Sequence, residues 1–319
     1  MTKTELPKIA KSAYGLAIAS WISEMGIIVT GGAVRVTGSG LGCSEWPKCT
    51  PESMVPTAEL GMHGAIEFGN RLLTFVLAGI ALALVVVLWK QRQHFRMIIG
   101  LAIGLMMTIP IQAVLGGITV WSGLNPWVVA GHFLVSAIMV AVATLMLVRV
   151  AAEHRRSKGE LAAHAPIVDG PTTGTTRMLA GSLIIFMALS VFFGTIVTGT
   201  GPHAGDPGAP RHNFDLELVA RIHVAPVWIL TAAALILTFL TFKIGGSATQ
   251  KRSVVLLVAA ILYQGVIGYV QYFTGVPIVL VLFHLLGTGL SISAVTYAAD
   301  KQLSKYRVHS VPEQLPAAV

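Results

Sequence analysis

Eight long apolar stretches constrain how this chain can fold more than any other feature. They lie near residues 13–36, 63–89, 97–120, 128–149, 179–199, 218–242, 253–273 and 278–299. Each is about 20 residues long or longer, the length that an α-helix needs to cross the hydrocarbon core of a bilayer. Hydrophobic residues make up 54% of the chain and charged residues only 11%, a balance that fits no soluble globular domain. The sequence therefore predicts an all-α integral membrane protein with eight transmembrane helices.

The lysines and arginines divide unevenly between the two sides of such a bundle. Of 22 in the chain, all but five lie in or beside the termini and the connections 90–96, 150–178 and 243–252; the exceptions are Arg35, Lys48, Arg71, Arg211 and Arg221. Because positive residues are retained on the cytoplasmic side, we expect a multi-pass protein of the cell membrane with both termini in the cytoplasm. The net charge of +8 then reflects topology and contact with anionic membrane lipid, and it does not indicate nucleic acid.

The chain also contains an internal repeat. Residues 111–133 align without a gap to residues 263–285, and TGSG at 37–40 matches TGTG at 198–201. The identical pairs in the longer alignment include Gln112/Gln264, Gly116/Gly268 and His132/His284. A unit with an even number of spans repeats in the same orientation across the membrane. We therefore expect two tandem, parallel four-helix bundles.

These bundles set the expected domain organisation. The N-terminal half spans 13–149 and the C-terminal half spans 179–299. Between them, residues 150–178 are polar, contain Gly and Pro, and lack a hydrophobic period, which predicts a cytoplasmic linker. Residues 300–319 are expected to form a cytoplasmic tail.

Three histidines lie inside predicted helices near the outer face of the membrane. They are His132, His223 and His284, and ionisable side chains within a membrane are functional candidates. His223 and His284 come from the second and fourth helices of one bundle, an arrangement that can hold a haem iron from both sides. A zinc ion would need a third or fourth ligand nearby. The alternative is that each histidine only hydrogen-bonds to a neighbouring helix.

The first half breaks the symmetry of the repeat. Aligning its second helix with that of the second half places Asn70 opposite His223, and Glu67 opposite an alanine. A carboxylate that faces a cavity can move protons or stabilise positive charge on a substrate, so Glu67 is the candidate catalytic residue. The alternative is an intrahelical ion pair with Arg71 at i,i+4 spacing. His63 shares a helix face with Asn70 but lies about 10 Å nearer the outer water.

The outer loops hold the remaining candidates. Cys43 and Cys49 lie in the first outer loop, which faces an oxidising space, and this favours a disulfide over two free thiols. His203, Arg211 and His212 belong to the third outer loop, where His212 is expected to be solvated.

Several of these motifs together resemble haem A synthase over residues 13–299. They are GGAVRVTGSGLGCSEWPKC in the first outer loop, EFGNR at the start of the second helix, and the histidines of the fourth, sixth and eighth helices. GTGPHAGDPGAP at 199–210 resembles the actinobacterial branch of that family. The resemblance implies a membrane oxidoreductase that oxidises the C8 methyl of haem O to a formyl group by successive hydroxylations, for terminal oxidase biogenesis.

The resemblance also implies roles for individual residues. Haem b would be held by His223 and His284 in the C-terminal half, near the outer face. Haem O would enter the N-terminal half, with His132 as an axial ligand. Glu67 falls on the essential glutamate of the family, and the two cysteines fall on its outer-loop pair. The implied partners are haem O synthase, an electron donor and further copies of the chain.

The chain departs from the family at one ligand position. The family pattern often reads Glu-x-x-His-Arg, and here Asn70 replaces the histidine, so Asn70 and His63 are both candidates for the second side of the substrate haem. Arg71, Arg211 and Arg221 are candidate partners of haem propionates, with Arg211 alternatively pointing to lipid headgroups. Two other functions are weighed against this one. A di-haem cytochrome would transfer electrons without modifying haem, and a transporter would need matching helix breaks, which the sequence lacks.

Overall fold

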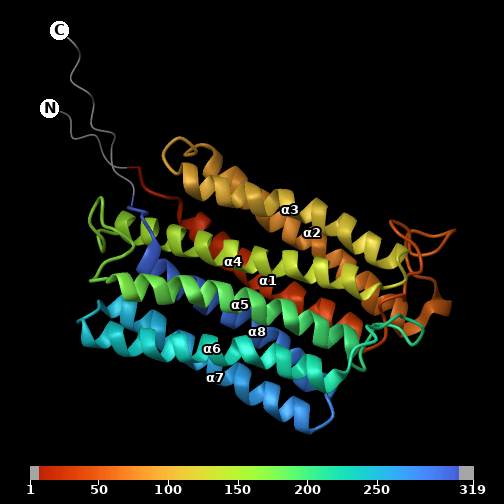
Figure 1. Cartoon of the computed structure of the whole chain (residues 1–319). Helices are drawn as coiled ribbons and strands as arrows, with labels where there is room; N and C mark the ends of the chain where they lie inside the picture. Colours follow the sequence, from red (N-terminus) through yellow and green to blue (C-terminus); the bar gives the residue numbers. More distant parts are fainter. Residues whose placement is uncertain (1–6, 309–319) are drawn as a thin grey trace.

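Residues 7–308 form a bundle of long helices in the computed structural model (Figure 1). The helices are α1 (Lys11–Val36), the short 3-10 helix η1 (Ala58–Leu60), α2 (Gly61–Trp89), α3 (Arg96–Trp121), α4 (Pro126–Ser157), α5 (Gly174–Thr200), α6 (Leu216–Lys243), α7 (Ala248–Phe273) and α8 (Ile278–Leu303). Within this described part, eight helices are long and apolar enough to cross a membrane. The same residues form no strand beyond an isolated bridge between Pro166 and Arg307. The predicted all-α membrane class is confirmed.

Side chains at several helix starts satisfy backbone N–H groups that have no partner inside the helix. Thr173 and Thr176 form a reciprocal capping box at the start of α5, and Ser247 and Gln250 form another at α7. Asp215 accepts a hydrogen bond from the third residue of α6. The caps explain why α5 and α7 each begin five residues before the apolar stretches that predict them, and α6 two residues before its stretch.

The helices pack as two neighbouring groups of four. In the first half, α1 and α3 each contact α2 and α4; in the second, α5 and α7 each contact α6 and α8. The halves meet through α1 and α4 against α8, and through α4 against α5. Figure 1 shows α1, α4, α5 and α8 in the middle of the molecule, with the other four helices outside them. A central layer of four helices is therefore shared by both halves.

The tightest packing lies at one end of the bundle, which we call the linker end because the 158–173 connection lies there. The largest fully buried side chains include Leu88 and Met146 in the first half and Leu237 and Leu257 in the second. The opposite end, which we call the loop end, carries the connections 37–57, 122–125 and 201–215. Dense packing at the linker end leaves the hollow part of the bundle at the loop end.

A buried ion pair joins the two halves near the linker end. The guanidinium of Arg149 in α4 donates to both carboxylate oxygens of Asp300 in α8, at 2.7 and 2.5 Å, and it also donates to Ser304 at 2.9 Å. Both charged side chains are almost fully buried. This paired geometry offsets part of the cost of burying two charges and fixes α4 against α8.

The helices at this end are longer than the apolar pattern predicts. Because α4 runs to Ser157 and α5 begins at Gly174, the non-helical linker covers only 158–173. Likewise α8 continues to Leu303, and the segment after it hydrogen-bonds back to the linker, from Ile167 N to Tyr306 O at 3.0 Å. The rest of the expected tail, residues 309–319, lies outside the described residues.

Candidate functional site

A cavity of about 2450 Å³ occupies the loop half of the bundle. All eight long helices contribute to its lining. Glu67, Asn70 and His132 line it from the first half, and His223 and His284 line it from the second. Its volume is well above the 300–1,000 Å³ or so that holds one drug-sized ligand. The structure therefore brings the main candidate residues of both halves into one cavity.

Each of the three membrane histidines lies against a glycine of the preceding helix. A Cβ placed on that glycine would lie only 3.2–3.6 Å from the imidazole Cε1 atom; the pairs are Gly116/His132, Gly194/His223 and Gly268/His284. A Cβ at Gly194 or Gly268 would press on the ring, because contacts at 3.2 Å are tighter than most, whereas the 3.6 Å at Gly116 is an ordinary van der Waals contact. The glycines thus leave the imidazoles room beside the neighbouring helix.

The same polar contacts support the histidine backbone in both halves. In the second half, the side-chain amide of Gln264 donates to the carbonyl of His284 at 3.0 Å and to Thr288 at 2.9 Å. In the first half, Gln112 donates to the carbonyl of His132 at 3.3 Å and to Ser136 at 2.6 Å. The hydroxyl residue four positions after each histidine also donates to the histidine carbonyl. The sequence repeat predicts the matching glutamines but not this role, and it stops before the hydroxyl residues.

His223 has the hydrogen bond expected of an iron ligand. Its Nδ1 lies 2.9 Å from the carbonyl oxygen of Ser190, and because a carbonyl only accepts, Nδ1 must carry the proton. Nε2 then presents its lone pair, and fixing the tautomer through the other nitrogen is a common feature of metal-binding histidines. The buried Nδ1 of His132 has no hydrogen-bond partner. On His284, the side-chain amide of Gln264 donates to Nε2 at 3.2 Å, so the proton lies on Nδ1, which is buried without a partner. His132 and His223 thus each keep a ring nitrogen for a group that takes axial nitrogen ligands, and His284 would present Nε2 to such a group by giving up the contact with Gln264.

A bare metal ion fits the cavity less well. Among residues 7–308, no group of three or more His, Cys, Asp or Glu side chains is placed to hold one. Imidazoles that come from separate helices instead suit a metal whose remaining ligands belong to a macrocycle, as in haem.

Asn70 occupies the corresponding place on α2. Its Nδ2 lies 4.0 Å from where a Cβ on Gly31 of α1 would be, so it lies against a glycine as the three histidines do. Its Oδ1 is buried without a hydrogen-bond partner. The amide of Asn70 thus lies near a glycine of the preceding helix, at a longer distance than the three imidazoles do.

Glu67 lies one helical turn before Asn70. Its side chain is 9% exposed, and its Oε1 accepts a hydrogen bond from Nε of Arg71 at 2.7 Å. The i,i+4 ion pair is therefore present. The second oxygen, Oε2, is buried and has no partner. An unpartnered carboxylate oxygen in a cavity wall is available to a substrate.

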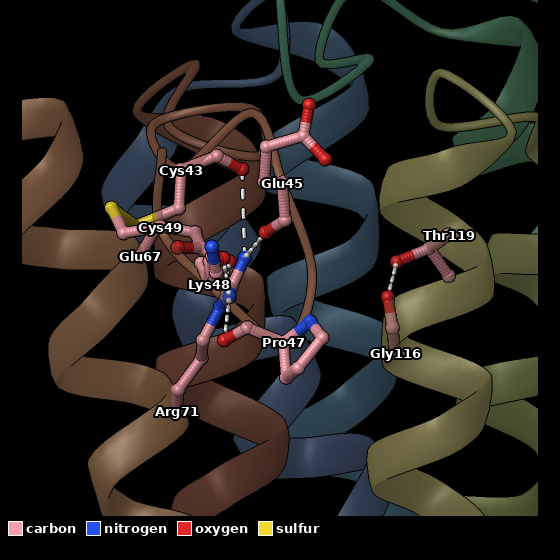
Figure 2. Close-up of polar contacts among 9 residues, drawn as sticks. All are labelled: Cys43, Glu45, Pro47, Lys48, Cys49, Glu67, Arg71, Gly116 and Thr119. Atoms are coloured by element: carbon pink, nitrogen blue, oxygen red, sulfur yellow. Dashed lines mark hydrogen bonds and ion pairs between the residues drawn. A yellow bond between two sulfur atoms is a disulfide. The ribbon is translucent and has the colours of Figure 1, made fainter. Parts of the chain in front are cut away.

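The remaining N–H groups of Arg71 are directed at the loop that closes this part of the cavity (Figure 2). An arginine has five N–H donors, and Nε uses one on Glu67. Nη1 and Nη2 reach four main-chain carbonyl oxygens, those of Glu45 and Lys48 at 2.9 Å, Pro47 at 3.4 Å and Cys43 at 3.5 Å. In this arrangement all five N–H groups of Arg71 are directed at Glu67 and at loop carbonyls, so a contact between Arg71 and a haem propionate stays a prediction.

That loop is closed by the predicted disulfide between Cys43 and Cys49, with an S–S distance of 2.02 Å. We call residues 43–49 the disulfide loop. Trp46 at its centre lies over Gly117 of α3, where a Cβ would come within 2.5 Å of the indole. The same indole lines the cavity and contacts Trp121 edge-on. The disulfide loop thus forms part of the cavity wall beside Glu67.

His63 lies apart from this cavity. It is exposed, its Nδ1 is 2.9 Å from the hydroxyl of Ser39, and it lines a separate pocket of about 450 Å³ together with Glu59 and Asp206. As expected from their separation along the helix, His63 does not lie beside Asn70 in the main cavity. This placement does not favour His63 as the second ligand of a group bound at His132.

The connection 201–215 at the loop end differs from its expected form at His212. The side chain is buried, packing edge-on to Trp127 at a centroid distance of 4.4 Å and stacking on Phe214 at 5.3 Å. The expectation that it is solvated is wrong, because Trp127 from α4 of the other half covers it. Burial, with a smaller contribution from the positive charge of Arg35, lowers the pKa of His212.

Besides Arg71, three arginines line the cavity at the loop end. Arg35, which sequence analysis does not single out, donates to the carbonyls of His203 at 2.6 Å and Thr198 at 2.8 Å, and so ties α1 to the second half. Arg211 donates to a loop carbonyl at 2.8 Å, and the exposed Arg221 pairs with Glu217. Arg211 and Arg221 keep N–H groups available at the edge of the cavity.

Known proteins resemble this chain over most of its length. It is 28% identical over 272 residues to proteins named heme A synthase from Listeria welshimeri and Listeria monocytogenes, which covers 82% of this chain and 86% of each relative. It is 31% identical over 151 residues to a heme A synthase from Bacillus licheniformis, which covers 47% of this chain and 49% of that one. A family model described as COX15-CtaA, cytochrome oxidase assembly protein, matches residues 14–296. The chain is therefore a multi-pass membrane protein that belongs to the COX15-CtaA family of cytochrome oxidase assembly proteins.

Proposed function

We propose that this protein is a haem A synthase, an oxidoreductase that converts the C8 methyl of haem O to a formyl group by successive hydroxylations. The observation that carries the proposal is the cavity itself: one half offers two imidazoles, and the other offers His132 with a carboxylate beside it. The family and the relatives named heme A synthase support it.

The second half suits a retained haem b. His223 and His284 would be its axial ligands, and the Ser190 carbonyl keeps the proton on Nδ1 of His223. Gln264 and Thr288 hold the backbone at His284. When bound, such a haem supplies one-electron transfer. Arg211 and Arg221 are available for its propionates or for those of the substrate.

The first half suits the substrate, haem O. His132 would bind its iron on one side, and Asn70 lies at the position of the missing second imidazole. The free Oε2 of Glu67 can accept a proton from the substrate or stabilise positive charge that develops at the reacting carbon. Arg71 holds the other oxygen of that carboxylate, so Oε2 is the atom available for this role.

The orientation of the bundle in the membrane follows from the distribution of basic residues and from the position of the disulfide. We place the linker end with its many basic residues in the cytoplasm and the loop end at the outer face of the cell membrane. A disulfide at the loop end fits an oxidising compartment. Haem O synthase would deliver the substrate, and an oxidant from outside this chain, together with an electron donor, would be needed to take the methyl group to a formyl group. Further copies of the chain are candidate partners in the membrane.

The test is reconstitution with haem O followed by mass spectrometry of the extracted haems. Wild-type protein should yield haem A, and Glu67→Gln should retain haem b and yield none. A matched substitution, Glu160→Gln at the exposed Arg155 pair near the linker end, should leave conversion unchanged. Wild-type protein that binds both haems yet leaves haem O unmodified would favour the alternative, a di-haem cytochrome. Protein purified without haem would favour a transporter.

A further inference from the structure

Within the described part of the chain, Arg71 is the only residue whose hydrogen bonds join Glu67 to the disulfide loop. One of its N–H groups binds the carboxylate and the other four are directed at loop carbonyls. We propose that Arg71 is a positioning residue through which the Cys43–Cys49 disulfide fixes Glu67, so that opening the disulfide lowers turnover without releasing haem b. This inference rests on the proposed function of Glu67.

The carboxylate depends on this one contact. Arg71 Nε is the hydrogen-bond donor to Oε1 of Glu67, and Oε2 has no partner. The Arg71 side chain is itself only 19% exposed, so the pair lies largely out of water. A charge-assisted hydrogen bond in such surroundings is stronger than a neutral one. The direction of the guanidinium therefore sets the direction of the carboxylate.

The guanidinium in turn depends on the path of the loop. Its four loop acceptors are the main-chain carbonyls of Cys43, Glu45, Pro47 and Lys48, all within the ring that the disulfide closes. The guanidinium is planar and its N–H donors have fixed directions, so it can bind several acceptors at once only if the distances between those acceptors stay constant. The disulfide closes the ring that contains these carbonyls, and it removes conformations that the open segment would adopt. Opening the ring removes the constraint that keeps the acceptors in place.

A glutamate–arginine pair with the same spacing in the second half lacks these features. Glu217 and Arg221 are also four residues apart, at the start of α6, and their side chains are 59% and 76% exposed. The Arg221 guanidinium donates to Glu217, and that half of the chain contains no cysteine. The contact to a loop is therefore a property of the first half and not of the i,i+4 spacing.

A double-mutant cycle tests the coupling in the purified holoprotein. We expect Cys43→Ser/Cys49→Ser and Arg71→Ala each to lower kcat for haem O by tenfold to a hundredfold, the size of effect that a misplacement of about 1 Å produces. KM and haem b content should change little. Adding the cysteine changes to Arg71→Ala should lower kcat no further, because the loop acts through Arg71. Effects that multiply would overturn the proposal.

Chemical reduction provides a reversible version of the same test. A dithiol such as dithiothreitol gives two electrons and two protons to the disulfide, yielding two thiols, and is itself oxidised to a disulfide. Wild-type activity should fall and return on reoxidation. Cys43→Ser/Cys49→Ser is the matched control and should not respond to the dithiol. Equal responses of the two proteins would contradict the proposal.

Hydrogen exchange gives a readout that needs no haem O. In Arg71→Ala with the disulfide intact, the peptide covering residues 43–49 should exchange faster than in wild type, and Arg71→Lys should fall between them. Arg155→Ala, which removes an exposed ion pair at the linker end, is the control and should match wild type. Wild-type exchange in Arg71→Ala refutes the contact itself. Faster exchange in a protein that cannot convert haem O would separate failure of the proposed function from failure of this inference.

Discussion

Asn70 lies against Gly31, with its Nδ2 4.0 Å from where a Cβ on that glycine would be. A histidine ring at position 70 would therefore lie near a glycine, as the three imidazoles in the cavity do. We therefore expect Asn70→His to increase the amount of haem that copurifies with the first half, because it adds an axial nitrogen opposite His132. Asn70→Ala should not. The measurement is haem iron per protein, and an unchanged ratio in Asn70→His would argue against an axial position here.

Glycines beside the imidazoles should resist substitution. A Cβ at Gly194 or Gly268 would lie 3.2 Å from a histidine ring, so the ring must shift by tenths of an ångström and its nitrogen with it. We expect Gly194→Ala and Gly268→Ala to lower haem b content. Gly181→Ala, in the same helix as Gly194 but facing open space, is the control. Equal haem b in all three variants would contradict the prediction.

Substituting the two repeated glutamines should have different effects in the two halves. Gln264→Leu removes the donor to the His284 carbonyl and to Thr288, and we expect it to lower haem b content. Gln112→Leu removes the corresponding donor in the first half. That variant should keep haem b and raise the KM for haem O. Loss of haem b in both variants would indicate that the halves do not divide these roles.

The buried ion pair at the linker end should matter for stability alone. Asp300→Asn leaves the Arg149 guanidinium buried without its charge partner, and breaking a buried pair in this way costs about 3–5 kcal/mol. Thermal unfolding in detergent measures the loss. Replacing both partners by Met and Leu should recover most of it, because no unpaired charge remains. A double variant as unstable as Asp300→Asn would contradict this account.

His212 predicts a pH dependence of stability. Burial, and secondarily Arg35, lower the pKa of this side chain, so the folded protein favours the neutral imidazole. As pH falls below the ordinary value of about 6.5, the unfolded chain takes up a proton that the folded chain does not, and stability decreases. His212→Gln should flatten the thermal stability profile between that value and the lowered pKa. A wild-type slope in His212→Gln would assign the effect to another group.

The repeat in the sequence predicts the part of the site that is built from helices. Alignment at a constant offset brings His132 onto His284, and both line the cavity with the same glutamine beside them. The hydrophobic stretches likewise predict the eight spans, because length and apolar content alone define a membrane-crossing helix. Helix ends extend further than predicted, since capping residues and the buried Arg149–Asp300 pair carry the helices past their apolar parts.

The parts that could not be predicted depend on contacts between segments distant in the sequence. Arg71 donates to main-chain carbonyls of the disulfide loop, which carry no signature in the residue types. His212 was expected to be solvated, yet Trp127 from the other half covers it. The glycine beside each imidazole comes from a separate helix, so only the packing of the bundle identifies the pair.

The contact between Arg71 and backbone carbonyls has an evolutionary consequence. A guanidinium that recognises main-chain oxygens constrains the contour of the loop and leaves the identities of Glu45 and Lys48 free to drift. The two cysteines preserve that contour, and Trp46 must stay because its indole fills the space over Gly117. The disulfide loop thus meets two demands, with its backbone and Trp46 serving the cavity and the side chains of Glu45 and Lys48 left open to change.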